Sequence, residues 1–314
     1  MIEKKNVLLR EVSWIKSMPT SSRGGVIHSL FIPESTEELI ILCRQLYKNN
    51  KKFLLIGHSS NTYLLPDTIY DIVIQTKCLK NWEVNHNNVI CETGVIVSAL
   101  SRAMIKEGYE GFEGLIDLPG TIGAAIYGNA GCYGCSVNNL LQSFDILCPN
   151  GNIISLEPQD LNPSKRSTSL KEGVIKGVII RATLNLRIGN KEKLLADAIR
   201  NTESRKRSIP NMKNNLGSVF AGVGRRTCLY FLCMSVVKLY GKILKGKYSY
   251  LEIQQKELSL LLTLLFARDL IPYLYHINCF VWKDDVSHKL FWKYVNLYRC
   301  LFRGDKLEIE IPQY

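Results

Sequence analysis

The chain has 314 residues, of which 46% are hydrophobic and 22% charged, and its formal net charge is +12. This composition is typical of a soluble globular protein, and the length predicts two or three subdomains, because single cores stop growing at about 250–300 residues. The basic residues are scattered, with short clusters at Arg205–Arg207, Arg225–Arg226 and Lys238–Lys247. No aromatic-interleaved RNA-binding signature accompanies them, so we expect no nucleic-acid partner.

Signals of export, membrane insertion and metal binding are missing from the sequence. Residues 1–5 lack the apolar run of a signal peptide. The most apolar stretch, Leu258–Ala267, is about half a membrane span long and predicts a buried helix. Ten cysteines without metal-ligand spacing indicate a reducing compartment, and the lone Cys132-x-x-Cys135 pair has no second pair to complete a zinc site. We therefore expect a cytoplasmic protein with no metal and no membrane partner.

The first elements along the chain are strands with one helix between them. Val26–Phe31 is an extended apolar run that Pro33 ends. Ser35-Thr36-Glu37-Glu38 has the pattern of a helix start, and the helix that follows carries apolar residues at Leu39, Leu42 and Leu46. Two apolar strands follow, at 52–56 and 69–75. A further strand at 88–94 precedes a helix at 98–107.

The later elements complete a mixed fold. Strands at 143–148 and 153–156 flank the turn Pro149-Asn150-Gly151-Asn152, which indicates a hairpin. Val174–Arg187 predicts a long strand or a pair of strands, and the polar stretch Gly189–Asn215 is interpreted as a link to a more helical part. This order of elements predicts an α+β protein.

Two turns rich in glycine and hydroxyl groups are the most informative features. The first, Gly57-His58-Ser59-Ser60-Asn61, follows the strand at 52–56. The second runs from Leu118-Pro119-Gly120-Thr121-Ile122-Gly123-Ala124-Ala125 to Asn129-Ala130-Gly131-Cys132-Tyr133-Gly134. Such turns allow positive φ and let backbone N–H groups converge on an anion, so the pair can hold the pyrophosphate of a dinucleotide from both sides. The first turn is neither a Walker loop nor a G-x-G-x-x-G fingerprint.

These turns resemble the flavin-binding loops of the UDP-N-acetylenolpyruvoylglucosamine reductase family. That family has a Gly-x-Gly-Ser-Asn loop and a Pro-Gly-Thr-x-Gly-Gly … Asn-Ala-Gly-x-Tyr-Gly loop. Ser59 and Ala124 each stand where the family has a glycine. The resemblance implies FAD bound by residues of both loops and by a later strand: Gly57, His58, Ser59, Ser60, Asn61, Pro119, Gly120, Thr121, Gly123, Ala124, Asn129, Gly177 and Ile179.

The same resemblance implies an architecture and a reaction. We expect a two-part FAD-binding domain of the PCMH (vanillyl-alcohol-oxidase-like) type at 1–190, with subdomains at about 1–82 and 83–190. A C-terminal α+β substrate domain is expected at 191–314. The implied reaction uses NADPH as hydride donor to reduce UDP-N-acetylglucosamine enolpyruvate, and we expect a monomer. FAD, NADPH and a UDP-sugar are polyanions, which is compatible with the positive net charge.

Three residues match positions that the family uses in catalysis. Arg166 lies in Lys165-Arg166-Ser167-Thr168-Ser169-Leu170-Lys171, which is similar to the family's Tyr-Arg-x-Ser-x-Phe-Lys. Ser218 lies in Gly217-Ser218-Val219-Phe220, although the family's Lys-Asn-Pro trailer is replaced by other residues. Glu308 is the first Glu of Leu307-Glu308-Ile309-Glu310-Ile311, which is similar to Leu-Glu-x-Glu-Val. His276-Ile277-Asn278 also resembles a His-Ala-Asn strand of the family.

The chemistry explains these residue types. Hydride addition to an enolpyruvyl double bond leaves carbanion character beside a carboxylate, which a cation such as Arg166 can stabilise. A hydroxyl such as that of Ser218 can deliver the proton, and Glu308 can orient a donor or hold water. The flavin supplies the redox chemistry.

Alternatives remain open at this stage because the resemblance is thin over residues 221–275. One is a relative that acts on another sugar in surface polysaccharide synthesis, and another is a flavin-binding module without turnover. Gly57-His58-Ser59 also resembles the Gly-His-Ser of oxidases that attach flavin covalently through that His. We favour noncovalent FAD, with His58 as an ordinary loop side chain.

Overall fold

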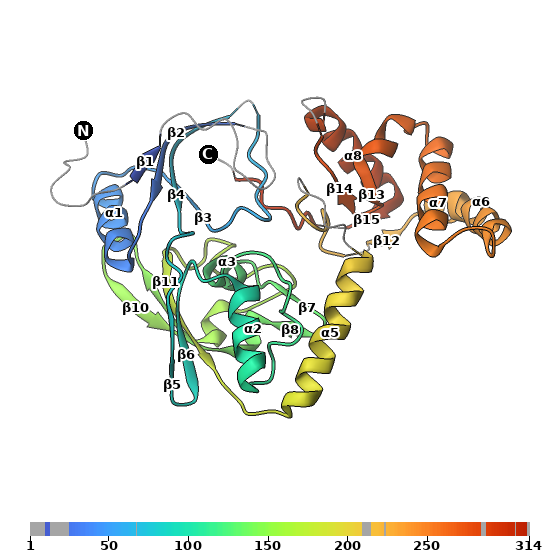
Figure 1. Cartoon of the computed structure of the whole chain (residues 1–314). Helices are drawn as coiled ribbons and strands as arrows, with labels where there is room; N and C mark the ends of the chain where they lie inside the picture. The colour runs from blue at the N-terminus through green and yellow to red at the C-terminus, as the bar shows by residue number, and fades with distance from the viewer. Residues whose placement is uncertain are drawn as a thin grey trace.

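The computed structural model describes residues 10–12, 25–66, 68–208, 215–222, 224–283, 287–304 and 306–312. Two separate sheets and a C-terminal group of helices make up the molecule (Figure 1). The first sheet has the order β1-β2-β4-β3, with β2 and β3 parallel to β4 and β1 antiparallel to β2. Its strands are β1 (Arg10–Val12), β2 (Val26–Ile32), β3 (Leu54–Ile56) and β4 (Ile69–Gln75).

The second sheet is antiparallel throughout and has the order β10-β9-β11-β6-β5. Its strands are β5 (Trp82–Asn85), β6 (Asn88–Glu92), β9 (Leu141–Leu147), β10 (Ile153–Leu156) and β11 (Val178–Asn185). The excursion between β6 and β9 holds α2 (Val97–Glu107), α3 (Ile122–Tyr127), β7 (Gly131–Cys132), β8 (Cys135–Ser136) and α4 (Val137–Leu140). A 3-10 turn at Pro158–Leu161 follows β10.

Helix α1 (Thr36–Lys48) joins the two sheets. Its Ser35 cap accepts the Glu38 N–H, as the sequence predicts. The buried Leu39, Leu42 and Leu46 pack in one cluster with side chains from both sheets, among them Ile74 and Val178. This shared core fixes one sheet relative to the other.

Helix α5 (Lys191–Ser208) corrects one prediction from the sequence. The polar stretch 189–215 was interpreted as a linker, but residues 191–208 form an 18-residue helix. Leu194 and Ala198 are buried, so one face of α5 lies in the core beside the second sheet. Helix α2 packs into the same core. Most of the other residues are polar or charged, and Leu195 and Ile199 are exposed, so the buried apolar stripe that identifies the helix is narrow.

The C-terminal part is mostly helical and has its own aromatic core (Figure 1). It contains β12 (Arg225–Arg226), α6 (Cys228–Leu244), α7 (Tyr250–Leu264), a 3-10 turn (Arg268–Tyr273), β13 (Leu274–His276), β14 (Cys279–Phe280), α8 (Ser287–Leu301) and β15 (Phe302–Arg303). Buried Leu258, Leu261 and Leu262 confirm a packed helix over the first part of the most apolar stretch, but the helix ends at Leu264 and Phe266 is exposed. No helix among the described residues is long and apolar enough to cross a membrane.

The first glycine loop ties this C-terminal part to the first sheet. Tyr63, just after the loop, is fully buried in the C-terminal aromatic core against Trp282 and Phe291. Its hydroxyl shares a hydrogen bond of 2.8 Å with His288 Nδ1. The loop is therefore held from both ends, by β3 on one side and by α8 on the other.

Candidate active site

A cleft of about 870 Å³ lies between the two glycine loops, strand β11 and the C-terminal segment 308–312. Every residue predicted to bind the cofactor lines this cleft except Asn129. The lining also includes apolar side chains of β3 and β11, such as Ile56 and Val178. Arg166, Glu308 and Glu310 also line the cleft, so it holds both the predicted cofactor residues and two charged side chains of the predicted catalytic set.

The two glycine loops pack directly against each other. A Cβ at Gly57 would lie 2.5 Å from Thr121 Oγ1, and one at Gly120, where φ is +108°, would lie 3.3 Å from Ser60 Oγ. Ser59 has φ of 52°, a left-handed conformation that explains why the resembled family has glycine there. The loops therefore approach closely because a glycine faces a hydroxyl side chain of the other loop in each contact.

One buried hydroxyl in the loops tests whether they fit a phosphate-bearing cofactor. Thr121 Oγ1 is buried and has no hydrogen-bond partner within the part of the chain that the structure describes. Thr121 is the N-cap of α3, yet its side chain makes no capping bond. A buried donor without a partner is costly, and an acceptor oxygen of a ligand would satisfy it. With apolar walls for a flat ring beside these polar loops, the cleft fits a flavin dinucleotide.

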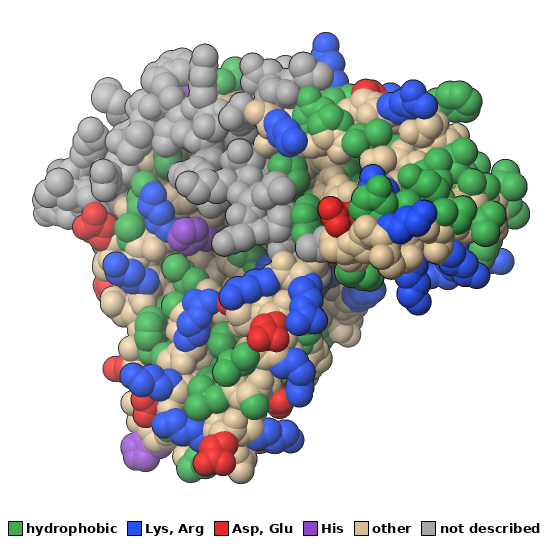
Figure 2. All heavy atoms as spheres, turned by 45° about the vertical axis from the view of Figure 1, so that its right-hand side comes forward, with side chains coloured by type: hydrophobic (Ala, Val, Ile, Leu, Met, Phe, Trp, Pro, Cys, Tyr) green, Lys and Arg blue, Asp and Glu red, His purple; other side chains and the backbone are tan. Residues whose placement is uncertain are grey.

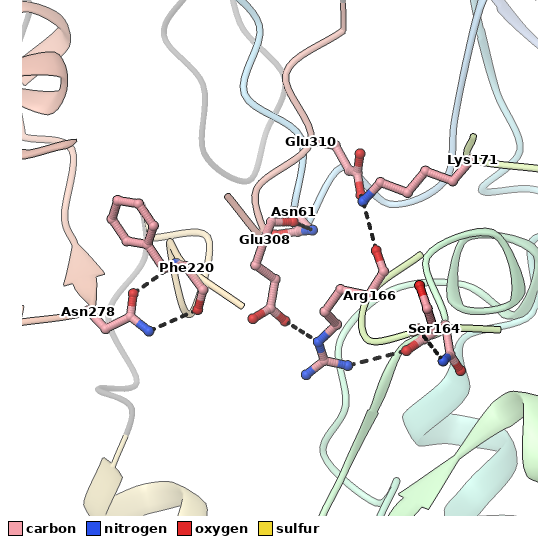
Figure 3. Close-up of polar contacts among 9 residues, drawn as sticks. Asn61, Ser164, Arg166, Lys171, Phe220, Asn278, Glu308 and Glu310 are labelled. Atoms are coloured by element: carbon pink, nitrogen blue, oxygen red, sulfur yellow. Dashed lines mark hydrogen bonds and ion pairs between the residues drawn. The ribbon is translucent and has the colours of Figure 1, made fainter. Parts of the chain in front are cut away.

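Four charged side chains form two ion pairs at one side of the cleft (Figure 3). Arg166 Nε lies 2.8 Å from Glu308 Oε1, and both side chains are mostly buried. Lys171 Nζ pairs with Glu310 Oε1 and also donates to the Arg166 carbonyl at 3.1 Å. Lys171 thus connects the two pairs. The sequence assigned roles to Arg166 and Glu308 but not to Lys171 or Glu310, although both stand in the matched motifs.

A tight turn holds Arg166 in place. Ser164 and Ser167 exchange both backbone hydrogen bonds across it, and Arg166 has φ of 58°. The guanidinium donates to the Asn129 carbonyl at 3.4 Å, while Asn129 Nδ2 donates to the Ser164 carbonyl at 2.7 Å. Asn129 therefore lies behind the turn that carries Arg166, outside the lining of the cleft, and its contact with cofactor stays a prediction.

Hydrogen bonds on both sides of the C-terminal segment hold Glu308 and Glu310 at the cleft. The Glu308 N–H donates to the Val219 carbonyl at 2.8 Å, and Asn61 Nδ2 donates to the Glu308 carbonyl at 2.8 Å. The Glu310 N–H then donates to the Asn61 carbonyl, and the Tyr63 N–H donates to the Glu310 carbonyl. Segment 306–312 is thus fixed between residues 219–221 and the first glycine loop.

Ser218 is half-buried beside this segment and is not among the residues that line the cleft. Two residues further on, Phe220 forms two hydrogen bonds with Asn278, whose Oδ1 accepts the Phe220 N–H at 2.8 Å and whose Nδ2 donates to the Phe220 carbonyl at 3.0 Å (Figure 3). The Asn of the His276-Ile277-Asn278 motif therefore fixes the backbone that carries Ser218. Ser218 directly precedes Val219, whose carbonyl accepts the Glu308 N–H.

The electrostatics of Glu308 have opposing contributions. Burial raises the pKa of Glu308 above its ordinary value, while Arg166, Lys171 and Lys165 act in the lowering direction and do not fully offset burial. Because the folded pKa exceeds the unfolded one, ionised Glu308 costs folding free energy. This cost is absent below the unfolded pKa and grows as the pH rises through the folded pKa.

Glu308→Gln is therefore expected to raise the melting temperature relative to the parent protein at neutral pH, despite the loss of an ion pair. The parent and variant should converge as the pH falls below about 4.3, where the parent carboxyl is neutral also in the unfolded chain. Thermal unfolding followed by circular dichroism from pH 4 to 8 measures the difference. A variant that loses stability increasingly as the pH rises would show that the ion pair outweighs burial.

Comparisons with known proteins agree with this site. A protein-family model described as "FAD binding domain" matches residues 28–157. The chain is 28% identical to the UDP-N-acetylenolpyruvoylglucosamine reductase of Caldanaerobacter subterraneus subsp. tengcongensis over 225 residues, which are 70% of this chain and 74% of that protein. It is 32% identical to the protein of the same name from Carboxydothermus hydrogenoformans over 63% of this chain and 65% of that one.

The fold comparison extends over nearly the whole chain. A crystal structure of the UDP-N-acetylenolpyruvylglucosamine reductase from Thermus caldophilus superposes with a TM-score of 0.66 and 19% identity, and covers 98% of this chain and 100% of that chain. The predicted α+β fold with a two-part FAD-binding domain is thereby confirmed.

Proposed function

We propose that this chain is a member of the UDP-N-acetylenolpyruvoylglucosamine reductase family and that it reduces UDP-N-acetylglucosamine enolpyruvate to UDP-N-acetylmuramate. FAD is its cofactor and NADPH its hydride donor, in the synthesis of a peptidoglycan precursor. The observation that carries the proposal is the joining of the two glycine loops and the Arg166–Glu308 pair in one cleft. We further infer that the protein is a cytoplasmic monomer. Its FAD-binding domain would span residues 1–190 and its substrate domain residues 191–314.

Each part of the cleft has its own role in the proposed reaction. When bound, FAD supplies the hydride chemistry, and the two loops would hold its pyrophosphate. Arg166 stabilises the negative charge that develops beside the substrate carboxylate, and Glu308 orients the guanidinium through the 2.8 Å contact at Nε. Ser218 donates the proton to the substrate carbon, from a backbone that Asn278 and Glu308 fix.

The function is tested by following the flavin absorbance of the purified protein. We expect one noncovalent FAD per chain, bleaching by NADPH and reoxidation by the enolpyruvyl sugar. Bleaching without reoxidation would indicate a relative that acts on another sugar, and FAD that NADPH does not bleach would indicate a binding module without turnover. Yellow colour that stays in the pellet after acid precipitation would instead indicate covalent attachment at His58.

Thr121→Val tests the cofactor site independently of turnover. The substitution keeps the shape of the side chain but removes the buried hydroxyl, for which the described residues supply no hydrogen-bond partner. We expect FAD to bind at least about tenfold more weakly, because a hydrogen bond to a charged group contributes about 1.5–3 kcal/mol. Thr121→Ser keeps the hydroxyl and is the matched control. Titration with FAD fluorescence measures both, and a valine variant that binds as tightly as the parent contradicts this assignment.

A further inference from the structure

Helix α6 presents an unusual apolar stripe to solvent. Its buried residues, Cys233, Val237, Gly241 and Leu244, lie on one side, and the helix packs against α7 and α8. The opposite side exposes five large apolar residues, with exposed fractions from 39% to 71%: Leu229, Leu232, Val236, Leu239 and Ile243. We call these five residues the α6 stripe.

The spacing of the α6 stripe makes it one continuous surface. Its members follow one another at alternating intervals of three and four residues, which places them on one face of a helix. At 1.5 Å per residue the stripe is about 20 Å long. Exposed Phe231 lies at its edge. Figure 2 shows hydrophobic side chains gathered over the end of the molecule formed by α6 and α7, with Lys and Arg side chains along the rim. Contiguous apolar surface of this kind marks an interaction site.

The charged residues of α6 itself all have one sign. Lys238 and Lys242 are exposed and flank the stripe on the side that also carries Phe231. From Ser204 to Leu251 the sequence contains no Asp or Glu, and it contains ten cationic residues: Arg205, Lys206, Arg207, Lys213, Arg225, Arg226, Lys238, Lys242, Lys245 and Lys247. This segment therefore carries most of the net charge of +12.

The combination of stripe and charge selects the partner. A second copy of this chain would bring Lys238 and Lys242 toward their own counterparts with no acidic residue of α6 to neutralise them, which is unfavourable. A nucleic acid would pair with the lysines but leave the apolar stripe exposed. An anionic bilayer surface meets both requirements, because apolar side chains enter the boundary of the acyl chains while lysines reach the headgroup phosphates.

We propose that the α6 stripe docks this protein on the surface of a membrane that contains anionic lipids. The helix would lie in the plane of the interface, with the lysine flank toward the headgroups. This inference goes beyond the proposed function and does not depend on it. It replaces our expectation from the sequence that the chain has no membrane partner. Helices α6 and α7 lie within residues 221–275, where the resemblance to the family is weak. We therefore attribute the docking surface to this chain and not to the reaction that the family shares.

The test is sedimentation of the FAD-loaded protein with vesicles. We expect binding to vesicles of equal parts phosphatidylglycerol and phosphatidylcholine, and at least about tenfold weaker binding to phosphatidylcholine alone. Leu232→Ser combined with Leu239→Ser should lower the affinity for the anionic vesicles by at least about tenfold, because binding scales with the apolar area that enters the interface. Lys238→Glu combined with Lys242→Glu should do the same and should weaken the salt dependence.

Matched controls separate docking from general damage. Val174→Ser with Ile188→Ser replaces two apolar residues outside α6 that are even more exposed than the α6 stripe. Lys80→Glu with Lys193→Glu reverses the charge of two exposed lysines outside α6. Both controls should bind vesicles like the parent, and all variants should retain the flavin spectrum. The proposal is overturned if the parent does not bind anionic vesicles, or if the α6 variants bind as the controls do. Concentration-dependent dimers without lipid that the serine variant abolishes would overturn it in favour of a second copy.

Discussion

Ser218→Ala should leave reduction of the bound flavin by NADPH nearly intact and slow the reoxidation of reduced flavin by the enolpyruvyl sugar by about 10²–10⁴-fold. That range is the usual cost of removing a general acid. Ser218 is half-buried, and its backbone neighbours are fixed by Asn278 and by the C-terminal segment, so the alanine variant should keep the fold. Stopped-flow absorbance of the flavin measures each half-reaction separately.

Two further variants sharpen the assignment of Ser218. Ser235→Ala removes a serine hydroxyl on α6 that donates to its own helix, and both half-reactions should stay within about twofold of the parent. Asn278→Ala removes the clamp on Phe220 and should slow the second half-reaction without removing the proton donor. If Ser218→Ala slows both halves equally, the substitution has damaged the flavin site. An unaffected second half would make Ser218 an ordinary turn residue.

Local signals in the sequence predicted much of the fold. Strand 69–75 and the start of α1 agree closely with the structure because alternation and capping depend on neighbouring residues. The short helix α3 (Ile122–Tyr127) was interpreted as loop, and the exposed edge strand β5 (Trp82–Asn85) was not predicted. Helix α5 was missed because Leu194 and Ala198 become buried only through contact with the rest of the domain. Tertiary packing decides such elements.

In the candidate site, too, local motifs were predicted from the sequence, whereas contacts between distant residues were not. The motifs supplied the identities of Arg166 and Glu308, and the structure brings them to 2.8 Å across the molecule. The pairing of Lys171 with Glu310 and the clamp of Asn278 on Phe220 were not predicted. Each joins residues far apart in the chain, so no spacing or periodicity indicates it. The boundaries of the two proposed domains also stay a prediction, since α5 packs on the core of the second sheet.

Arg166→Ala is expected to slow the second half-reaction by about 10²–10³-fold, because it removes a preorganised cation from the place where negative charge develops. Reduction of flavin by NADPH should change far less. Arg102→Ala is the matched control, since it also breaks an arginine–carboxylate pair, with Asp117 at 2.6 Å, on α2 and outside the cleft. It should leave both half-reactions within about twofold of the parent.

The double variant Arg166→Ala with Glu308→Gln then decides how Glu308 acts. If Glu308 works by orienting the guanidinium at 2.8 Å, its substitution has nothing further to remove once Arg166 is gone. The double variant should therefore be about as slow as Arg166→Ala alone, as expected for residues that act as a unit. Rates that fall by the product of the two single effects would show that Glu308 contacts the reaction by a separate route. In that case Glu308 would be a catalytic residue in its own right rather than a positioning residue.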